Sequence, residues 1–153
     1  MGTQFEVEVP AAPQKVEDTI GRASAAKVLF VDDRADLLDY LVEFAQKEEI
    51  EADKAPSAAL ASVMLATTQY DLVFIDLDMP GKGGRQLAVE TRNGKGPNAS
   101  SSLIAFSASE RRDVGEAWPF DKFVEKPLDR NELRRLVANP PVGASRAVPH
   151  FAS

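Results

Sequence analysis

Residues 72–81 have the sequence LVFIDLDMPG, in which four apolar residues are followed at once by an acid, Asp76. A short apolar run of this kind is typical of a strand that is buried on both faces of a parallel sheet. Met79-Pro80-Gly81 and Gly83-Gly84 then break the chain before a helix that runs through Leu87. The stretch therefore predicts a strand that ends at an acid, and a turn that leads into a helix.

Three other short runs end at polar residues in the same way. They are Val28–Val31 before Asp32-Asp33, Leu103–Phe106 before Ser107, and Phe123–Glu125 before Lys126-Pro127. A weaker alternation over residues 50–55 predicts an edge strand. The chain is thus expected to contain five strands, four of which end in a residue that can take part in chemistry.

Helical spacing of apolar residues lies between the strands. One helix is predicted from the spacing of Leu37, Leu38, Leu41, Val42 and Ala45. A second helix has Ser57 as its N-cap and carries Leu60, Val63 and Met64 on one face. The last helix begins at a capping box of Asp129 and Glu132 and carries Leu133, Leu136 and Val137 on its apolar face. Alternating strands and helices predict a parallel sheet with helices on both faces. We expect a flavodoxin-like (βα)5 doubly wound fold with strand order 2-1-3-4-5.

In this architecture ligands bind outside the carboxyl ends of the strands. The polar residues predicted at those ends are Asp32, Asp33, Asp76, Ser107 and Lys126. Each one alone has an ordinary structural explanation, since Asp often caps helices, Ser often occupies turns and most lysines are solvated. Their joint placement in order at strand ends favours one shared site over these separate explanations.

The residue types at the strand ends suit one kind of chemistry. Carboxylates gathered at one point raise each other's pKa unless a cation is present, so the acids predict a divalent ion, and their hard oxygen ligands suit Mg²⁺. A carboxylate beside that ion can attack phosphorus, while the ammonium of Lys126 neutralises charge on the phosphoryl oxygens. A hydroxyl such as that of Ser107 can then follow the new oxygen and move its loop.

Composition excludes several other functions. The 153-residue chain has 18 Lys and Arg against 24 Asp and Glu, a formal net charge of -6, which disfavours direct binding to nucleic acid. It has no cysteine, and its single histidine, His150, lies in a Pro/Ala/Ser-rich tail. Thiolate chemistry is therefore excluded, and one histidine cannot supply the several ligands that a histidine-based metal site needs. The sequence contains neither an apolar run near the roughly 20 residues that span a bilayer nor a signal peptide, so we expect a cytoplasmic chain without membrane contact.

From Lys27 to Val137 the chain resembles the response-regulator receiver family. The motifs that carry the resemblance are Val31-Asp32-Asp33, Phe74–Gly81, Phe106-Ser107-Ala108 and Glu125-Lys126-Pro127. The resemblance implies that Asp76 is phosphorylated, that Asp33, Asp76 and the backbone carbonyl of Asp78 ligate Mg²⁺, and that Asp32 supports the water shell of the ion. It also implies that Ser107, Ala108 and Lys126 bind the phosphoryl group, that the Lys126–Pro127 bond is cis, and that Phe123 is the aromatic residue whose rotamer reports activation.

Two features depart from the family pattern. The segment between Ser107 and Lys126 is short, and Trp118-Pro119 stands near where receivers commonly have a Gly-Ala pair. We therefore expect a curtailed fourth helix, which leaves the output surface undefined. The side chain of Asp78 is a further acid at a position that varies in the family, and we expect it to influence the lifetime of the phosphoryl group.

The predicted organisation is an N-terminal extension or linker over residues 1–26, a receiver domain over 27–137 and a disordered tail over 138–153. Residues 2–10 are similar to the closing Gly-Thr turn and last strand of histidine-kinase ATP-binding domains. If that similarity is meaningful, the chain is the C-terminal receiver of a hybrid histidine kinase. A tag or an isolated edge strand could have the same pattern.

The predicted function is that of a phosphoacceptor in two-component or phosphorelay signalling, and not that of an enzyme with its own substrate. The expected partners are a histidine kinase, a histidine phosphotransfer protein, or both. The alternative is a Mg²⁺-dependent phosphohydrolase of the haloacid-dehalogenase type, because Asp76-Leu77-Asp78 matches the Asp-x-Asp core of those enzymes. Such enzymes place the motif on an early strand and follow it with Thr or Val, whereas here an Asp pair precedes it and Met79 follows.

Overall fold

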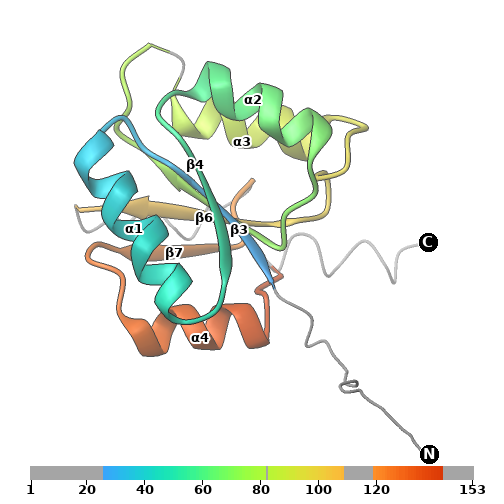
Figure 1. Cartoon of the computed structure of the whole chain (residues 1–153). Coiled ribbons are helices and arrows are strands. Elements are labelled where there is room, and N and C mark those ends of the chain that lie inside the picture. Colours follow the sequence, from blue (N-terminus) through green and yellow to red (C-terminus); the bar gives the residue numbers. More distant parts are fainter. Residues whose placement is uncertain (1–25, 82, 109–118, 143–153) are drawn as a thin grey trace, which may run out of the picture.

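The computed structural model describes residues 26–81, 83–108 and 119–142, in which strands and helices alternate (Figure 1). The elements are β3 (Lys27–Val31), α1 (Ala35–Lys47), β4 (Glu51–Ala55), α2 (Ala58–Thr67), β5 (Leu72–Asp76), α3 (Gly84–Asn93), β6 (Ser102–Ser107), β7 (Lys122–Glu125) and α4 (Arg130–Ala138). The five predicted strands lie at these positions, and their ends differ from the prediction by at most one residue. Short apolar runs bounded by polar residues therefore predict the positions of the strands in this chain.

The five strands form one parallel sheet in the order β4-β3-β5-β6-β7. Numbered along the chain, this is the predicted order 2-1-3-4-5, so the flavodoxin-like fold is confirmed. The register pairs Val31 with Ile75, and Asp76 with Phe106. Because neighbouring strands end almost level, the residues that follow them meet at one edge of the sheet.

In the described part of the chain, helices α1 and α4 lie against one face of the sheet, and α2 and α3 lie against the other (Figure 1). Successive residues of a strand point to opposite faces. In β3, Val28 and Phe30 pack with the buried residues of α1 and α4, whereas Leu29 and Val31 pack with those of α2 and α3. Both faces of the central strands are thus buried, which explains why their sequences are apolar throughout and do not alternate.

The predicted inner face of α2 was wrong in part. Leu60 and Val63, expected to face the core, have 43% and 61% of their surface exposed. The buried residues of α2 are Ala58, Ala61 and Leu65, and Met64 is partly buried against the same cluster. The sequence of this helix, AALASVMLAT, is apolar almost all round, so its periodicity could not define one face. Small alanines face the core, where the helix comes close to its neighbours.

The predicted helix caps form as expected at Ser57 and Asp129. The side chain of Ser57 accepts a hydrogen bond from the Leu60 N–H at 3.1 Å, and that of Asp129 accepts one from the Glu132 N–H at 3.4 Å. Each cap satisfies one of the N–H groups that the first turn of a helix leaves without a partner.

The last helix ends one residue after Val137, where the predicted receiver segment ends. Helix α4 includes Ala138, and the Ser102 hydroxyl donates to the carbonyl of Pro141 at 2.6 Å. The predictions for the N-terminal segment, for the curtailed helix before Trp118 and for the tail from residue 143 lie outside the described residues. Among the helices that the structure describes, none combines the length and apolar character that crossing a bilayer requires.

Candidate functional site

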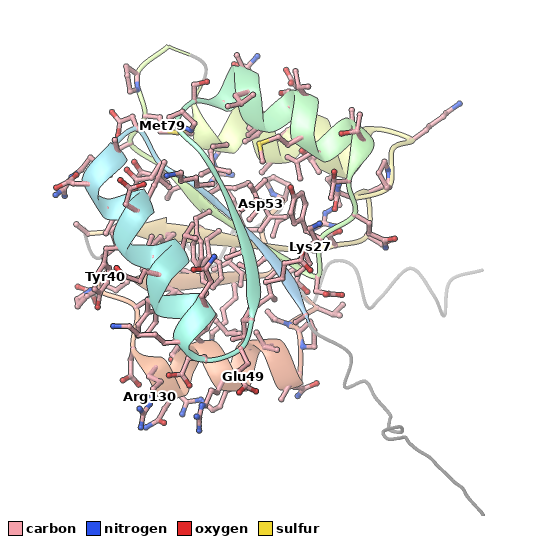
Figure 2. All side chains as sticks on the ribbon, viewed as in Figure 1. Lys27, Tyr40, Glu49, Asp53, Met79 and Arg130 are labelled. Atoms are coloured by element: carbon pink, nitrogen blue, oxygen red, sulfur yellow. The ribbon has the colours of Figure 1, made fainter. Side chains whose placement is uncertain are left out.

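Three of the predicted acids meet where β3 and β5 end. Asp76 is the last residue of β5, and Asp32 and Asp33 follow β3 directly. One carboxylate oxygen of each residue lies within 4.8 Å of the others. Asp32 and Asp76 are buried and Asp33 is exposed. In Figure 2, Met79, in the loop after β5, marks this end of the sheet, and Lys27 marks the opposite end.

Lys126 follows the edge strand β7 and brings a positive charge to these acids. Its Nζ lies 2.6 Å from Oδ2 of Asp32 and 3.6 Å from Oδ1 of Asp76. Its backbone N–H donates to the carbonyl of Ser107 at 2.8 Å, which joins the loop after β7 to the end of β6. The Lys126–Pro127 peptide bond is cis, the isomer that the family resemblance implied.

The ring of Phe106 supports the lysine from the core side. Lys126 Nζ lies 5.3 Å from the centroid of this ring, within the range of a cation–π contact. Phe106 is buried at the end of β6 and packs edge to face against Phe74 of β5, with ring centroids 5.4 Å apart. The sequence prediction treated both residues only as parts of strands.

Among the residues that the structure describes, the site carries more negative than positive charge. Burial raises the pKa of the Asp76 carboxyl, and the nearby Asp32 and Asp78 carboxylates act in the same direction. The backbone N–H of Asp78, which donates to Oδ1 of Asp76 at 3.3 Å, and the ammonium of Lys126 offset this rise only in part. A divalent cation beside Asp76 would remove the remaining cost of ionising it, and a set of carboxylate oxygens is what Mg²⁺ prefers.

Ser107 and Asp78 lie together at the same edge of the sheet. Ser107 is fully buried at the end of β6, and its hydroxyl donates to Oδ2 of Asp78 at 3.3 Å. Asp78 itself is exposed in the loop after β5. The predicted hydroxyl is therefore present at the site, and it contacts an acid whose side chain was not expected to bind it.

The remaining predicted residues lie around this group. Ala108 follows Ser107 and is exposed, as is Pro127. Phe123 pairs with Ala105 of β6 and is partly buried against the core between the sheet and helices α2 and α3. The functional roles that the resemblance implies for these residues stay predictions.

Gly84 was predicted only as part of a chain break, and its structural role is more specific. A Cβ atom built at this position would lie 2.2 Å from the carbonyl oxygen of Asp76 and 2.8 Å from Cγ2 of Ile75. At Gly83 nothing lies within 4 Å of such an atom. Helix α3 therefore packs against the end of β5 at a distance that only glycine allows, which holds the backbone of Asp76 in place.

Similar proteins agree with this arrangement. A family model described as the response regulator receiver domain matches residues 28–138. The sensor histidine kinase AruS of Pseudomonas aeruginosa is 27% identical over 146 residues, which cover 92% of this chain and 14% of the kinase. The sensor protein GacS of Pseudomonas syringae is 32% identical over 139 residues, covering 82% of this chain and 15% of that protein. The chain thus spans a small part of either sensor protein.

Among solved structures, the response regulator protein TrrA of Thermotoga maritima, in complex with Mg²⁺ and BeF, is 31% identical with a TM-score of 0.65. The match covers 74% of this chain and 96% of TrrA. A match of the family model to most of the chain, the five-stranded parallel sheet and the acids at its carboxyl edge lead to the same result. The chain belongs to the response regulator receiver domain family.

Proposed function

We propose that this receiver domain accepts a phosphoryl group from a phosphohistidine onto Asp76, with Mg²⁺ bound, and passes on either the group or a change of conformation. One observation carries the proposal. The carboxylates of Asp32, Asp33 and Asp76 approach within 4.8 Å of one another, and Lys126 Nζ lies 2.6 Å from one of them and 3.6 Å from another. Family membership gives the chemistry, and this geometry supports Asp76 as the acceptor.

In the transfer step, an oxygen of the ionised Asp76 carboxylate attacks phosphorus. The new O–P bond forms as the P–N bond to the imidazole breaks, and the imidazole leaves with the electron pair and takes up a proton. The ammonium of Lys126 neutralises charge on the phosphoryl oxygens during the transfer. The N–H of Asp78 and the Lys126 ammonium favour the ionised form of Asp76, which the attack requires.

The residues that would hold Mg²⁺ are Asp33, Asp76 and the backbone carbonyl of Asp78, with Asp32 supporting the water shell. When bound, the ion supplies positive charge to the carboxylates and to the transferred group. Two contacts orient Asp32: its Oδ1 accepts a hydrogen bond from the Arg34 N–H at 3.0 Å, and its Oδ2 pairs with Lys126.

The phosphoryl oxygens would be bound by Lys126, by the hydroxyl of Ser107 and at Ala108. The hydrogen bond between the Lys126 N–H and the Ser107 carbonyl ties two of these residues together. A shift of Ser107 toward the phosphoryl group would thus be passed to the start of the loop after β7. Phe123 lies on β7 three residues before Lys126, and its rotamer is the proposed readout.

The phosphohydrolase alternative is not supported, since the chain belongs to the receiver family over residues 28–138. The Asp76-Leu77-Asp78 segment resembles the haloacid-dehalogenase core only locally. We propose that the chain catalyses only its own phosphorylation and dephosphorylation, and no reaction on a separate substrate.

The relatives also support a place in a larger protein. The match to AruS covers 92% of this chain and so extends beyond residues 28–138. We propose that the chain is the receiver of a hybrid histidine kinase, with residues 1–26 as the kinase remnant and linker. It would act in the cytoplasm with a histidine kinase or a histidine phosphotransfer protein, without direct contact with nucleic acid.

The test is phosphorylation by acetyl phosphate in the presence of Mg²⁺, followed by phosphate-affinity electrophoresis. The parent protein should be retarded, and Asp76→Asn should not. Asp36→Asn is the matched control, because Asp36 is an exposed acid in the first turn of α1, and it should behave as the parent does. Equal retardation of the Asp76→Asn protein would show that another residue is the acceptor. Repeated turnover of a phosphate ester would favour the hydrolase instead.

A further inference from the structure

The proposed transfer gives no task to the side chain of Asp78, yet this side chain holds the buried hydroxyl that is expected to switch. Ser107 is fully buried, and its Oγ donates to Oδ2 of Asp78 at 3.3 Å. Asp78 is exposed, so a substitution at this position leaves the core unchanged.

A serine hydroxyl carries one proton and can donate it to one acceptor at a time. A phosphoryl oxygen on Asp76 would therefore compete with the Asp78 carboxylate for the same proton. The distance of 3.3 Å is longer than the roughly 2.5 to 3.0 Å of a strong O–H···O bond. The contact is weak enough for a phosphoryl oxygen to displace it.

The backbones on both sides of this contact are held. The Asp78 N–H donates to Oδ1 of Asp76 at 3.3 Å, and the Ser107 carbonyl accepts from the Lys126 N–H at 2.8 Å. The change of acceptor can therefore begin as a rotation of the Ser107 side chain, and the shift of Ser107 that is passed to the loop after β7 follows it.

We propose that Asp78 acts as a latch, a positioning residue that holds the Ser107 hydroxyl in the unphosphorylated state and opposes its movement to the phosphoryl oxygen. The inference rests on the proposed function, because it requires a phosphoryl group on Asp76. It differs from simple charge repulsion between Asp78 and the phosphoryl group. Repulsion acts whether or not Ser107 has a hydroxyl, whereas the latch acts only through that hydroxyl.

A double-mutant cycle separates the two effects. The probe is beryllofluoride with saturating Mg²⁺, the pair present in the TrrA structure, and the readout is its dissociation constant from calorimetric titration. The four proteins are the parent, Asp78→Ala, Ser107→Ala and the double variant. Asp78→Ala should bind the probe about two- to threefold more tightly than the parent, the factor that corresponds to the lower end of the range for a hydrogen bond, because the contact is long. In the Ser107→Ala background the same change should give little or no gain.

Two further variants sharpen the test. Asp78→Asn removes the charge but keeps an oxygen that can accept from Ser107, so its gain should be smaller than that of Asp78→Ala. Asp36→Ala removes an exposed negative charge elsewhere and should leave the affinity unchanged.

The outcomes distinguish the latch from the proposed function. An equal gain from Asp78→Ala with and without the Ser107 hydroxyl, or no gain at all, would overturn the latch while the phosphoacceptor role stands. Failure of the parent both to bind beryllofluoride and to be phosphorylated on Asp76 would overturn the proposed function and the latch together.

Discussion

Two buried ion pairs lie at opposite ends of the sheet and have similar local geometry. At the carboxyl end, Lys126 Nζ lies 2.6 Å from Asp32, with 14% and 1% of the two side chains exposed. At the amino end, a nitrogen of Arg92 in α3 lies 2.8 Å from Asp121, just before β7, with 7% and 1% exposed. The difference between them lies in the groups that surround each pair.

The pair at the amino end is surrounded by matching partners. The Arg92 guanidinium also donates to the carbonyls of Ala99, Ser101 and Pro119, at distances from 2.7 to 3.4 Å. The carboxylate of Asp121 accepts a further bond from the Leu103 N–H at 2.9 Å. The fork of the guanidinium joins the segments that lead into β6 and β7.

Within the described residues the carboxyl end differs, because Asp33, Asp76 and Asp78 add negative charge around Lys126. Such an excess costs stability in the folded chain and leaves a place for a cation and a phosphoryl group. A buried ion pair alone therefore does not reveal its role. The balance of charges and hydrogen bonds around it separates a structural contact from a functional one.

The largest expected effect is at the amino end. Arg92→Met removes the cation that pairs with the buried Asp121 carboxylate, and should lower the free energy of unfolding by about 3 to 5 kcal/mol. Urea unfolding followed by circular dichroism measures it. Arg92→Lys keeps the positive charge but not the planar guanidinium, so its free energy of unfolding should fall by less than that of Arg92→Met. An ordinary surface ion pair contributes up to about 1 kcal/mol. If Arg92→Met loses less than that, the pair of Arg92 and Asp121 does not stabilise the fold in the way proposed here.

Magnesium should act at the carboxyl end alone. At a concentration of 100 times its Kd, Mg²⁺ should raise the free energy of unfolding by about 2.7 kcal/mol, and EDTA should reverse the gain. Asp33→Asn should lose most of this increment, whereas Arg92→Lys should keep it because Arg92 lies at the other end of the sheet. Equal increments in the Asp33→Asn and parent proteins would place the ion elsewhere.

The close contact under the acceptor residue provides a third test. Gly84→Ala forces a Cβ atom against the Asp76 carbonyl oxygen, and should cost about 1 to 3 kcal/mol of stability and slow phosphorylation. Gly83→Ala is its neighbouring control, since open space surrounds that position. Similar stability of the two variants would show that α3 can shift without cost.

The smallest effect should have the opposite sign. Without Mg²⁺ at neutral pH, Asp76→Asn should raise the free energy of unfolding by about 0.5 to 2 kcal/mol, because it removes a buried charge that the site compensates poorly. Asp121→Asn should instead lower the free energy of unfolding, since it removes the charge of the carboxylate that pairs with Arg92. A less stable Asp76→Asn protein would contradict the idea of excess charge at the carboxyl end.

The pH dependence follows from the raised pKa of Asp76. A group whose pKa is higher in the folded state stabilises the fold below its unfolded pKa, and this contribution is lost as the pH rises through the folded pKa. The advantage of Asp76→Asn over the parent should therefore shrink as the pH falls from the raised value toward the ordinary value of 3.8. Unfolding curves of both proteins across that range, without Mg²⁺, provide the measurement.

Local sequence patterns predicted the strands, the cap at Ser57 and the polar residues at the strand ends. They did not reveal Asn98, a buried side chain that accepts from the Tyr70 N–H and donates to the carbonyls of Leu65 and Thr68. These contacts join the end of α2 to the segment before β6. In the sequence Asn98 lies in a Gly- and Pro-rich stretch, where an asparagine is expected simply as a turn residue.

The amino-acid sequence alone was enough to predict the parallel sheet and the kinds of residue at its carboxyl edge. A strand that is buried on both faces must be apolar, so the first polar residue after an apolar run marks the end of the strand. The pairing of each cation with its acid was decided only by the three-dimensional structure. Lys126 and Asp32 are 94 positions apart, and Arg92 and Asp121 are 29 apart. Such pairs depend on the path of the whole chain and on how closely α3 approaches β5, and no local pattern records either.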